Sequence, residues 1–345
     1  MKICPQCHAT HSEDLALCPS DGTALVDSEA WPEGTVVNSK YRILAKIGED
    51  VVCTAYKAVH LNSEQLRTLK VMSWNLACDP GFVTLFEQDA LQRKKLQHAN
   101  VARVEDIGEA EDGRPFIVME YVAGQSLEKY IQQDAPFAPL RACAIAKQVA
   151  AGLEAAHALG MVHRDVKPEK IYLLDGPGSE KIKLLGLGVS KLQEALLGDR
   201  FRTSPEAVIG TFEYLSPEQA LGQLGNQLDG RADLYSLGVV MYQMLTREFP
   251  FHAVTAADWM TAHIQGAPIP IRVAHADLGI PDVLTDLVMR CLKKNRESRP
   301  ASAREFIREV EYVEKEIDRT AKAKQSPPKT PGHRKPSQGW KFWKS

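Results

Sequence analysis

The pattern of apolar and polar positions changes character about one third of the way along the chain. Apolar residues first alternate with polar ones at the period of two expected of half-buried strands, in residues 41–48, 52–59, 66–72, 101–112 and 114–122. A helical spacing interrupts them once, at residues 82–96. After Gly124 only helical periodicity remains, in residues 140–160, 233–245, 283–295 and 303–317. The pattern predicts an α+β fold in which a small β-rich lobe precedes a larger helical lobe.

The two ends of the chain differ from this central part. Residues 1–26 form a short cysteine-bearing segment, and residues 27–40 form a polar linker. Residues 313–345 are rich in lysine, proline and serine, and this composition predicts a largely disordered tail.

Composition is typical of a globular protein, with 44% hydrophobic and 25% charged residues. The chain carries a net charge of −2, but eight basic and no acidic residues follow from Arg319 onward, so the rest carries −10. The terminal GWKFWKS suits weak contact with an anionic membrane, and a solvated tail is the alternative. No basic groove suggests nucleic acid, and no segment resembles a membrane span or a signal peptide, so we expect a cytoplasmic protein, either free or peripheral at the membrane.

The N-terminal cysteines have the spacing of a zinc site. Cys4 and Cys7 form one Cys-Pro-x-Cys turn, and Cys18 opens a similar turn in which Asp21 stands where a fourth cysteine would be. Two such turns that face each other hold zinc in a tetrahedron. The segment resembles a degenerate zinc ribbon with ligands Cys4, Cys7, Cys18 and Asp21, and His8 and His11 remain open as the fourth ligand. A leader without metal is the alternative.

A series of short motifs follows in order through the central segment. They are RTLKVM (67–72), FIVMEYV (116–122), HRDVKPEK (163–170), GTFEYLSPE (210–218), GRADLYSLG (230–238) and ESRPAS (297–302). In this order and register, residues 41–312 resemble a protein kinase, most of all the bacterial serine/threonine kinases. The resemblance implies a bilobal kinase fold with a small β-rich N-lobe and a large helical C-lobe.

The resemblance also implies a nucleotide site between the lobes. Lys70 matches the strand lysine that holds the nucleotide phosphates, and Gly48 matches the first glycine of the loop above them. Glu120 to Val122 match the backbone that faces the adenine. In the catalytic loop, Asp165 matches the position of the catalytic base, and Lys167 follows two residues later.

Two further motif residues have structural roles in the family. Asp233 matches the aspartate that holds the backbone of the catalytic loop. Arg299 matches the arginine that pairs with a glutamate, here Glu218. The resemblance therefore implies that the framework around the site is kept.

The two metal-ligand positions of the family are substituted. Phosphoryl transfer needs magnesium held by one asparagine and one aspartate. This chain has Lys170 at the first position and Gly186 at the second. Because magnesium prefers oxygen ligands, these two residues argue against a magnesium site.

Other nucleotide contacts depart from the family as well. The glycine-rich loop keeps only Gly48, and Asp50 puts a carboxylate where phosphate would lie. The two residues that enclose adenine correspond to Thr68 and Tyr172, and the tyrosine is large enough to fill the pocket. ATP binding, with or without metal, therefore stays open.

The helix at 82–96 offers two carboxylates as ion-pair partners for Lys70. Asp89 occupies the family position, with Arg93 four residues later where an apolar residue is usual. A shift of two residues in the helix register would bring Glu87 and Leu91 into these roles instead. The sequence predicts that Lys70 pairs with either Asp89 or Glu87.

Together these features favour a non-catalytic kinase-like protein that acts as a scaffold or as an allosteric regulator of a protein partner, such as an active kinase. The alternative is an active, ATP-dependent serine/threonine kinase with atypical metal handling, which Lys70 and Asp165 favour. Thr203 and Ser204 lie next to arginines in the activation segment and are candidates for phosphorylation.

Overall fold

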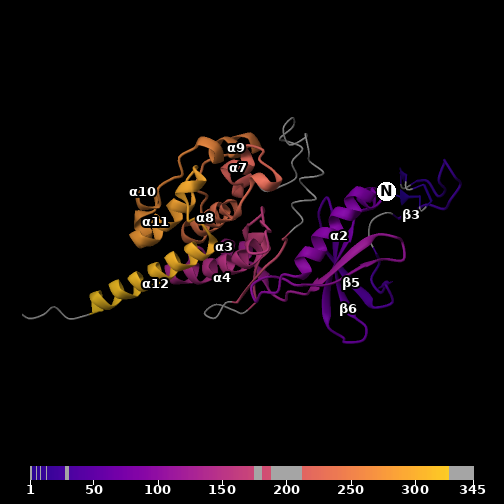
Figure 1. The fold of residues 1–345 in the computed structure, drawn as a ribbon, viewed down its shortest axis with the longest axis horizontal. Coiled ribbons are helices and arrows are strands. Elements are labelled where there is room, and N and C mark those ends of the chain that lie inside the picture. The colour runs from indigo at the N-terminus through magenta and orange to yellow at the C-terminus, as the bar shows by residue number, and fades with distance from the viewer. Residues whose placement is uncertain are drawn as a thin grey trace, which may run out of the picture.

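The computed structural model describes residues 2–4, 6–7, 9–12, 14–27, 31–174, 181–187 and 212–325. Within these ranges, a six-stranded antiparallel sheet and a helical region follow one another, as Figure 1 shows. The sheet has the order β4-β5-β6-β7-β9-β8. Its strands are β4 (Val36–Val37), β5 (Tyr41–Glu49), β6 (Cys53–His60), β7 (Leu66–Met72), β8 (Val104–Glu109) and β9 (Pro115–Glu120). The strands predicted from the sequence are confirmed to within a few residues.

The helical region contains the predicted helices and several shorter elements. Its main helices are α3 (Leu127–Asp134), α4 (Pro139–His157), α8 (Gly230–Thr246), α9 (Ala256–Gln265), α11 (Asp282–Cys291) and α12 (Ala303–Gln325). Short elements join them: β10 (Gln125–Ser126), η1 (Pro168–Lys170), β11 (Ile171–Leu173), β12 (Ile182–Leu184), η3 (Phe212–Tyr214), α7 (Pro217–Ala220), η4 (Gly225–Gln227), α10 (Ile271–Ala274), η5 (Ala276–Leu278) and η6 (Arg296–Ser298). The N-lobe adds α1 (Trp74–Ala77) and α2 (Pro80–Lys94). The sequence predicted α4, α8, α11 and α12, but not α3 or α9.

The apolar side chains of the N-lobe sheet form two clusters, and the second half of β5 is exposed. One face packs against α2, which crosses the sheet in Figure 1, through Met72, Phe86 and Ile117. Tyr41 and Phe116 belong to a second cluster on the sheet. Burial of an aromatic or aliphatic side chain contributes roughly 1.5–3 kcal/mol, so these clusters hold the lobe together.

Helix α8 is the centre of the C-lobe core. Nearly every residue from Ala232 to Thr246 is buried, which explains why this segment is apolar without a clear polar face. Its neighbours are α4 and α11. This rigid core carries the loop that contains Asp165, so the position of that side chain is set by packing rather than by the loop itself.

The N-terminal segment forms a small sheet of its own. Strands β1 (Lys2–Ile3), β2 (Thr10–His11) and β3 (Val26–Asp27) pair in the order β2-β1-β3, all antiparallel. Cys4 and Cys18 are the buried side chains of this segment among those described. Two-residue strands and two buried side chains give little apolar core, which is the situation in which small domains depend on a metal or another cross-link.

The C-terminal boundary differs from the prediction. The sequence predicts that the disordered tail begins at residue 313, but α12 continues to Gln325 and lies along α4 (Figure 1). Val313 is buried in the C-lobe core, and Glu314 pairs with Lys147 at 2.6 Å. The polar composition of this stretch is that of an amphipathic helix with one packed face. None of the helices in the described part of the chain combines the length and apolar character that a membrane crossing requires.

Candidate functional site

A hollow of about 330 Å³ lies beneath the sheet, between the N-lobe and C-lobe. Its walls are mostly apolar, with Lys70 and Gly186 at one end and the segment after β9 at the other. The lining residues are Ile47, Ala55, Thr68, Lys70, Ala102, Met119, Glu120, Tyr121, Val122, Gly124, Tyr172, Leu185 and Gly186. Thr68 and Tyr172 are both among them, and the hollow remains open beside Tyr172.

The end of β9 is fixed by ion pairs of its last residue, Glu120. Glu120 lies 2.6 Å from Lys183 and 3.3 Å from Arg103, and its backbone N–H donates to the carbonyl of Arg103. Val122 follows without a backbone partner among the described residues, so its N–H is available to a ligand in the hollow. No sequence pattern predicts the Glu120–Lys183 pair, because the two residues are 63 positions apart.

The catalytic loop is held from below by α8, as the resemblance implied. Asp233 is fully buried and accepts hydrogen bonds from the backbone N–H groups of His163 at 2.9 Å and Arg164 at 2.7 Å. Arg164 has a φ of 66°, a strained value for a residue with a side chain. The two hydrogen bonds that Asp233 accepts hold this conformation in the residue directly before Asp165.

Asp165 lies between two lysines. Its carboxylate contacts the ammonium of Lys170 directly and lies 3.4 Å from that of Lys167. Burial alone would raise the pKa of Asp165, but the two ammonium groups, Lys170 first, outweigh burial and lower it. The carboxylate is therefore ionised and already paired with cations of the protein.

Lys170 lies against Gly186 and uses the space that a side chain there would need. A Cβ atom placed on Gly186 would lie 2.7 Å from Cδ of Lys170 and 3.0 Å from its Cε and Nζ. The backbone at Gly186 has a φ of +88°, which favours glycine. The two degenerate metal positions are thus in contact, and each residue fits the other.

The predicted ion pair of Lys70 is wrong. Asp89 faces inward on α2, but it pairs with Arg93 at 2.8 Å, and both side chains are buried. Glu87 is exposed, and so is Leu91, which excludes the shifted register. Among the described residues no side chain forms an ion pair or hydrogen bond with Lys70. Burial lowers its pKa, and the cations Lys170 and Arg93 add to the decrease.

The turn between β5 and β6 replaces the glycine-rich loop. Gly48 pairs with Ala55 across the hairpin, outside the residues that line the hollow. At the tip, one carboxylate oxygen of Asp50 accepts hydrogen bonds from the N–H groups of Val52 and Cys53, each at 2.8 Å. An aspartate that bonds to the backbone two residues later is a recognisable turn signal, so the sequence contained the information that predicts this tip.

The four predicted zinc ligands lie together. One ligand atom from each of Cys4, Cys7, Cys18 and Asp21 falls within 4.8 Å of all the others. Backbone N–H groups point at two of the sulfurs, from Cys7 to Cys4 and from Ser20 to Cys18, each at 3.4 Å. Such N–H groups favour negative charge on the sulfurs of Cys4 and Cys18.

Two side chains near the three cysteines are candidates for the fourth ligand, Asp21 and His11. Nε2 of His11 lies 3.6 Å from Sγ of Cys18, and Sγ of Cys4 lies 3.1 Å from Asp21. A hydrogen bond from the Thr23 backbone lowers the pKa of Asp21, so the carboxylate is ionised. His8, the alternative histidine ligand, lies outside the described residues.

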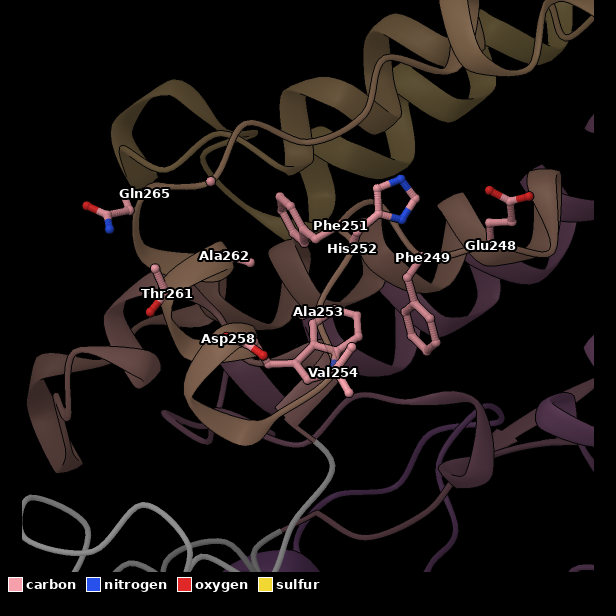
Figure 2. A pocket seen from close by; sticks show the side chains of 12 residues that line it. Glu248, Phe249, Phe251, His252, Ala253, Val254, Asp258, Thr261, Ala262 and Gln265 are labelled. Carbon is pink, nitrogen blue, oxygen red and sulfur yellow. The ribbon is translucent and has the colours of Figure 1, made fainter.

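A second hollow, of about 880 Å³, opens on the C-lobe beside α9 (Figure 2). Phe249, Phe251 and Trp259 form its apolar part, and Glu248 and Asp258 contribute carboxylates. None of the motifs that carry the kinase resemblance contributes a residue to this hollow.

Several residues singled out in the activation segment lie outside the described ranges. These are Thr203, Ser204 and the neighbouring Arg200 and Arg202. The phosphorylation of Thr203 or Ser204 therefore stays a prediction.

Comparison with known proteins agrees with the architecture. Residues 41–311 match the family model described as "Protein kinase domain". The chain is 37% identical over 284 residues to the serine/threonine-protein kinase pkn3 of Myxococcus xanthus, which covers 82% of this chain and 51% of that protein. It is 36% identical over 241 residues to PknB of Mycobacterium leprae, which covers 69% and 37%, respectively. The chain thus spans about half or less of the length of these relatives.

Solved structures agree on the fold. The kinase domain of PknI from Mycobacterium tuberculosis, in a double-mutant form, superposes with a TM-score of 0.62 at 24% identity, covering 82% of this chain and 98% of the other. A structure of Rad53 in complex with AMP-PNP gives a TM-score of 0.63 at 20% identity, covering 78% and 64%. At these identities the likeness concerns the fold alone.

Proposed function

We propose that this chain, which belongs to the protein kinase family and resembles its bacterial serine/threonine members, is a signalling protein that regulates or scaffolds a partner without transferring phosphate. The observation that carries the proposal is the contact between Lys170 and Gly186. A side chain with a fixed positive charge fills the place where two metal ligands would be needed.

The electrostatics of the site support this proposal. Asp165 is already paired with Lys170 and Lys167, so a hydroxyl substrate would meet a carboxylate whose charge is largely neutralised. A divalent cation would have to enter beside an ammonium and would find neither ligand of the family. Without the metal, the charge that develops during phosphoryl transfer has no adequate counterion.

A second candidate function is an active serine/threonine kinase with atypical metal handling. Lys70 and Asp165 keep their family positions, and the relatives are named as kinases. In this case, Lys170 would supply part of the positive charge of the missing metal.

A phosphoryl-transfer assay distinguishes these two functions. With magnesium or manganese and labelled ATP, we expect the chain to label a generic serine/threonine substrate at least about a thousandfold more slowly than an active bacterial kinase, because a metal accounts for several kcal/mol of the barrier. The Asp165→Asn variant is the control for contaminating activity. Transfer that Asp165→Asn abolishes would support the active-kinase function and overturn the first proposal.

The partner of a non-catalytic kinase fold would be a protein, such as an active kinase. The hollow beside α9 suits a partner segment that carries apolar and basic side chains, because aromatic rings line it and Glu248 and Asp258 add negative charge. Val254, which also lines this hollow, is 92% exposed and would be covered by such a segment.

We further propose that the N-terminal segment binds one zinc ion through Cys4, Cys7, Cys18 and Asp21. Zinc–sulfur bonds of about 2.3 Å separate neighbouring ligands of a tetrahedron by roughly 3.8 Å. The observed separations are close to this, with 3.4 Å between the sulfurs of Cys7 and Cys18. His11 is the alternative fourth ligand.

Elemental analysis of the purified chain tests the zinc proposal. We expect about one equivalent of zinc, loss of nearly all of it in Cys18→Ser, and weaker retention in Asp21→Ala. The variant His11→Ala is the matched control and should keep the metal. Zinc below about half an equivalent in the unmodified chain would contradict the site. Loss of zinc in His11→Ala but not in Asp21→Ala would show that His11, and not Asp21, is the fourth ligand.

A further inference from the structure

The tip of the β5–β6 hairpin carries its own anion. The Asp50 carboxylate receives the N–H groups of Val52 and Cys53 at 2.8 Å each, and the Asp50 N–H donates to the carbonyl of Cys53 at 2.9 Å. In a glycine-rich loop, such N–H groups are the ones that backbone offers to phosphate. Here a carboxylate of the same chain has taken two of them.

The hairpin tip is also held in place by packing and by hydrogen bonds to Ser73. Val52 is fully buried in the cluster between the sheet and α2. Its carbonyl accepts a hydrogen bond from Ser73 N–H at 2.8 Å, and the Ser73 hydroxyl donates to the carbonyl of Val51. To release the N–H groups from Asp50, a phosphate would have to break this arrangement.

The cations around the hollow are mostly committed elsewhere. Lys170 and Lys167 face Asp165, and Arg93 pairs with Asp89. Among the described residues lining the hollow, this leaves Lys70 as the cation without an ion pair, and Asp50 is one of the groups whose charge acts on it. One lysine beside a carboxylate is a poor match for the three phosphates of a nucleoside triphosphate.

The other end of the hollow keeps apolar walls and a backbone N–H group, to which an uncharged ring can bind. Its walls are apolar, from Ile47 and Ala55 above to Leu185 below. Val122 offers an N–H group for which no described residue is the acceptor, and Met119 lies at the back. A flat heterocycle buried there would gain apolar contacts and one or more hydrogen bonds without any charge.

We propose that this hollow binds an uncharged nucleoside-like heterocycle in preference to a nucleoside triphosphate, because Asp50 occupies the phosphate cradle from within. The inference rests on the proposed non-catalytic function, since a kinase that transfers phosphate must hold a triphosphate. It adds the chemical class of the ligand and the residue that selects it.

Calorimetric titration of the full chain with adenosine, guanosine, ATP and GTP tests this selection. Each titration is run once with a chelator and once with magnesium. We expect at least one nucleoside to bind about tenfold or more tightly than its triphosphate in both conditions, since phosphates gain no charge-assisted hydrogen bonds from the tip. Equal or tighter binding of both triphosphates, or no binding of either nucleoside, would overturn the inference.

Two variants identify the residue responsible. Asp50→Ala frees both N–H groups and removes the charge, so triphosphate binding should tighten about tenfold while nucleoside binding changes less than about twofold. Glu49→Ala removes the same charge from the neighbouring position, where Glu49 pairs with exposed Lys46 instead of the tip, and should alter neither affinity. An equal gain in both variants would mean that net charge alone selects the ligand and would refute the role of Asp50.

The outcome is separable from the proposed function. Preference for a triphosphate without phosphoryl transfer would refute this inference and leave the non-catalytic function intact. Preference for a nucleoside together with slow transfer at high ATP would refute the non-catalytic function alone.

Discussion

Replacing Arg299 by leucine is expected to lower the free energy of unfolding of the chain by about 3–5 kcal/mol, because it leaves the Glu218 carboxylate buried without its cation. The Arg299 guanidinium is fully buried and forms two parallel bonds of 2.8 Å with the two carboxylate oxygens of Glu218. It also donates to the carbonyls of Arg231, Lys293 and Lys294. The pair thus ties α7 and the segment before α12 to α8.

Urea unfolding of the purified variants measures this effect. Arg299→Lys keeps the charge but not the two-pronged geometry, and should lose a large part of the stability. The double variant Arg299→Leu with Glu218→Leu removes both charges, so it should recover part of what Arg299→Leu loses. A single variant within about 1 kcal/mol of the parent would mean that the ion pair contributes little.

The same residues explain why so much of the fold could be predicted. Strands 52–59 and 66–72 could be predicted because each contributes apolar residues to the two N-lobe clusters, whereas strand 41–48 contributes Tyr41 and Ile43 to the second cluster alone. Helix α8 could be predicted because residues 233–245 combine helical periodicity with the apolar content of a buried helix. The residues 313–325 misled the prediction because one apolar position per turn, such as Val313 or Ile317, is enough to dock a helix along α4.

The candidate site was less predictable because its partners come from distant segments. That Lys170 and Gly186 differ from the family could be read from the sequence, but their mutual contact depends on the turn at φ +88°. The predicted partner of Lys70 is wrong because Asp89 pairs with Arg93, four residues along the same helix. An i,i+4 pair needs no tertiary structure to form, so it competes well against a lysine on another element.

In both contacts, a charged side chain of the protein stands where a kinase binds a charged ligand. Where an active kinase would recruit magnesium, this chain has the Lys170 ammonium, and where it would recruit phosphate, the chain has the Asp50 carboxylate. Each of these charges satisfies a group of the fold that would otherwise need a ligand, namely Asp165 and the hairpin N–H groups.

The pairing of Lys170 with Gly186 predicts that a metal site returns only when both residues change. In the variant Lys170→Asn with Gly186→Asp, two oxygen ligands face the space that the lysine occupies in the parent. We expect millimolar magnesium to raise the melting temperature of this double variant by about 3 °C, because a cation at roughly ten times its dissociation constant stabilises by about 1.4 kcal/mol. The parent should show no response.

The single variants test the physical reason. Gly186→Asp alone puts a Cβ 2.7 Å from the Lys170 side chain and keeps the ammonium in place, so magnesium should have no effect on it. Lys170→Asn alone supplies one ligand, which is too few. The variant that combines Lys170→Asn with Gly186→Asn matches the first double variant in shape but lacks the carboxylate. Magnesium should not change its melting temperature. A magnesium response in either single variant would show that the two positions act independently.

Phosphoryl transfer should still be absent from the double variant until Asp50→Gly also clears the hairpin tip, because metal without a phosphate cradle cannot hold the triphosphate in line.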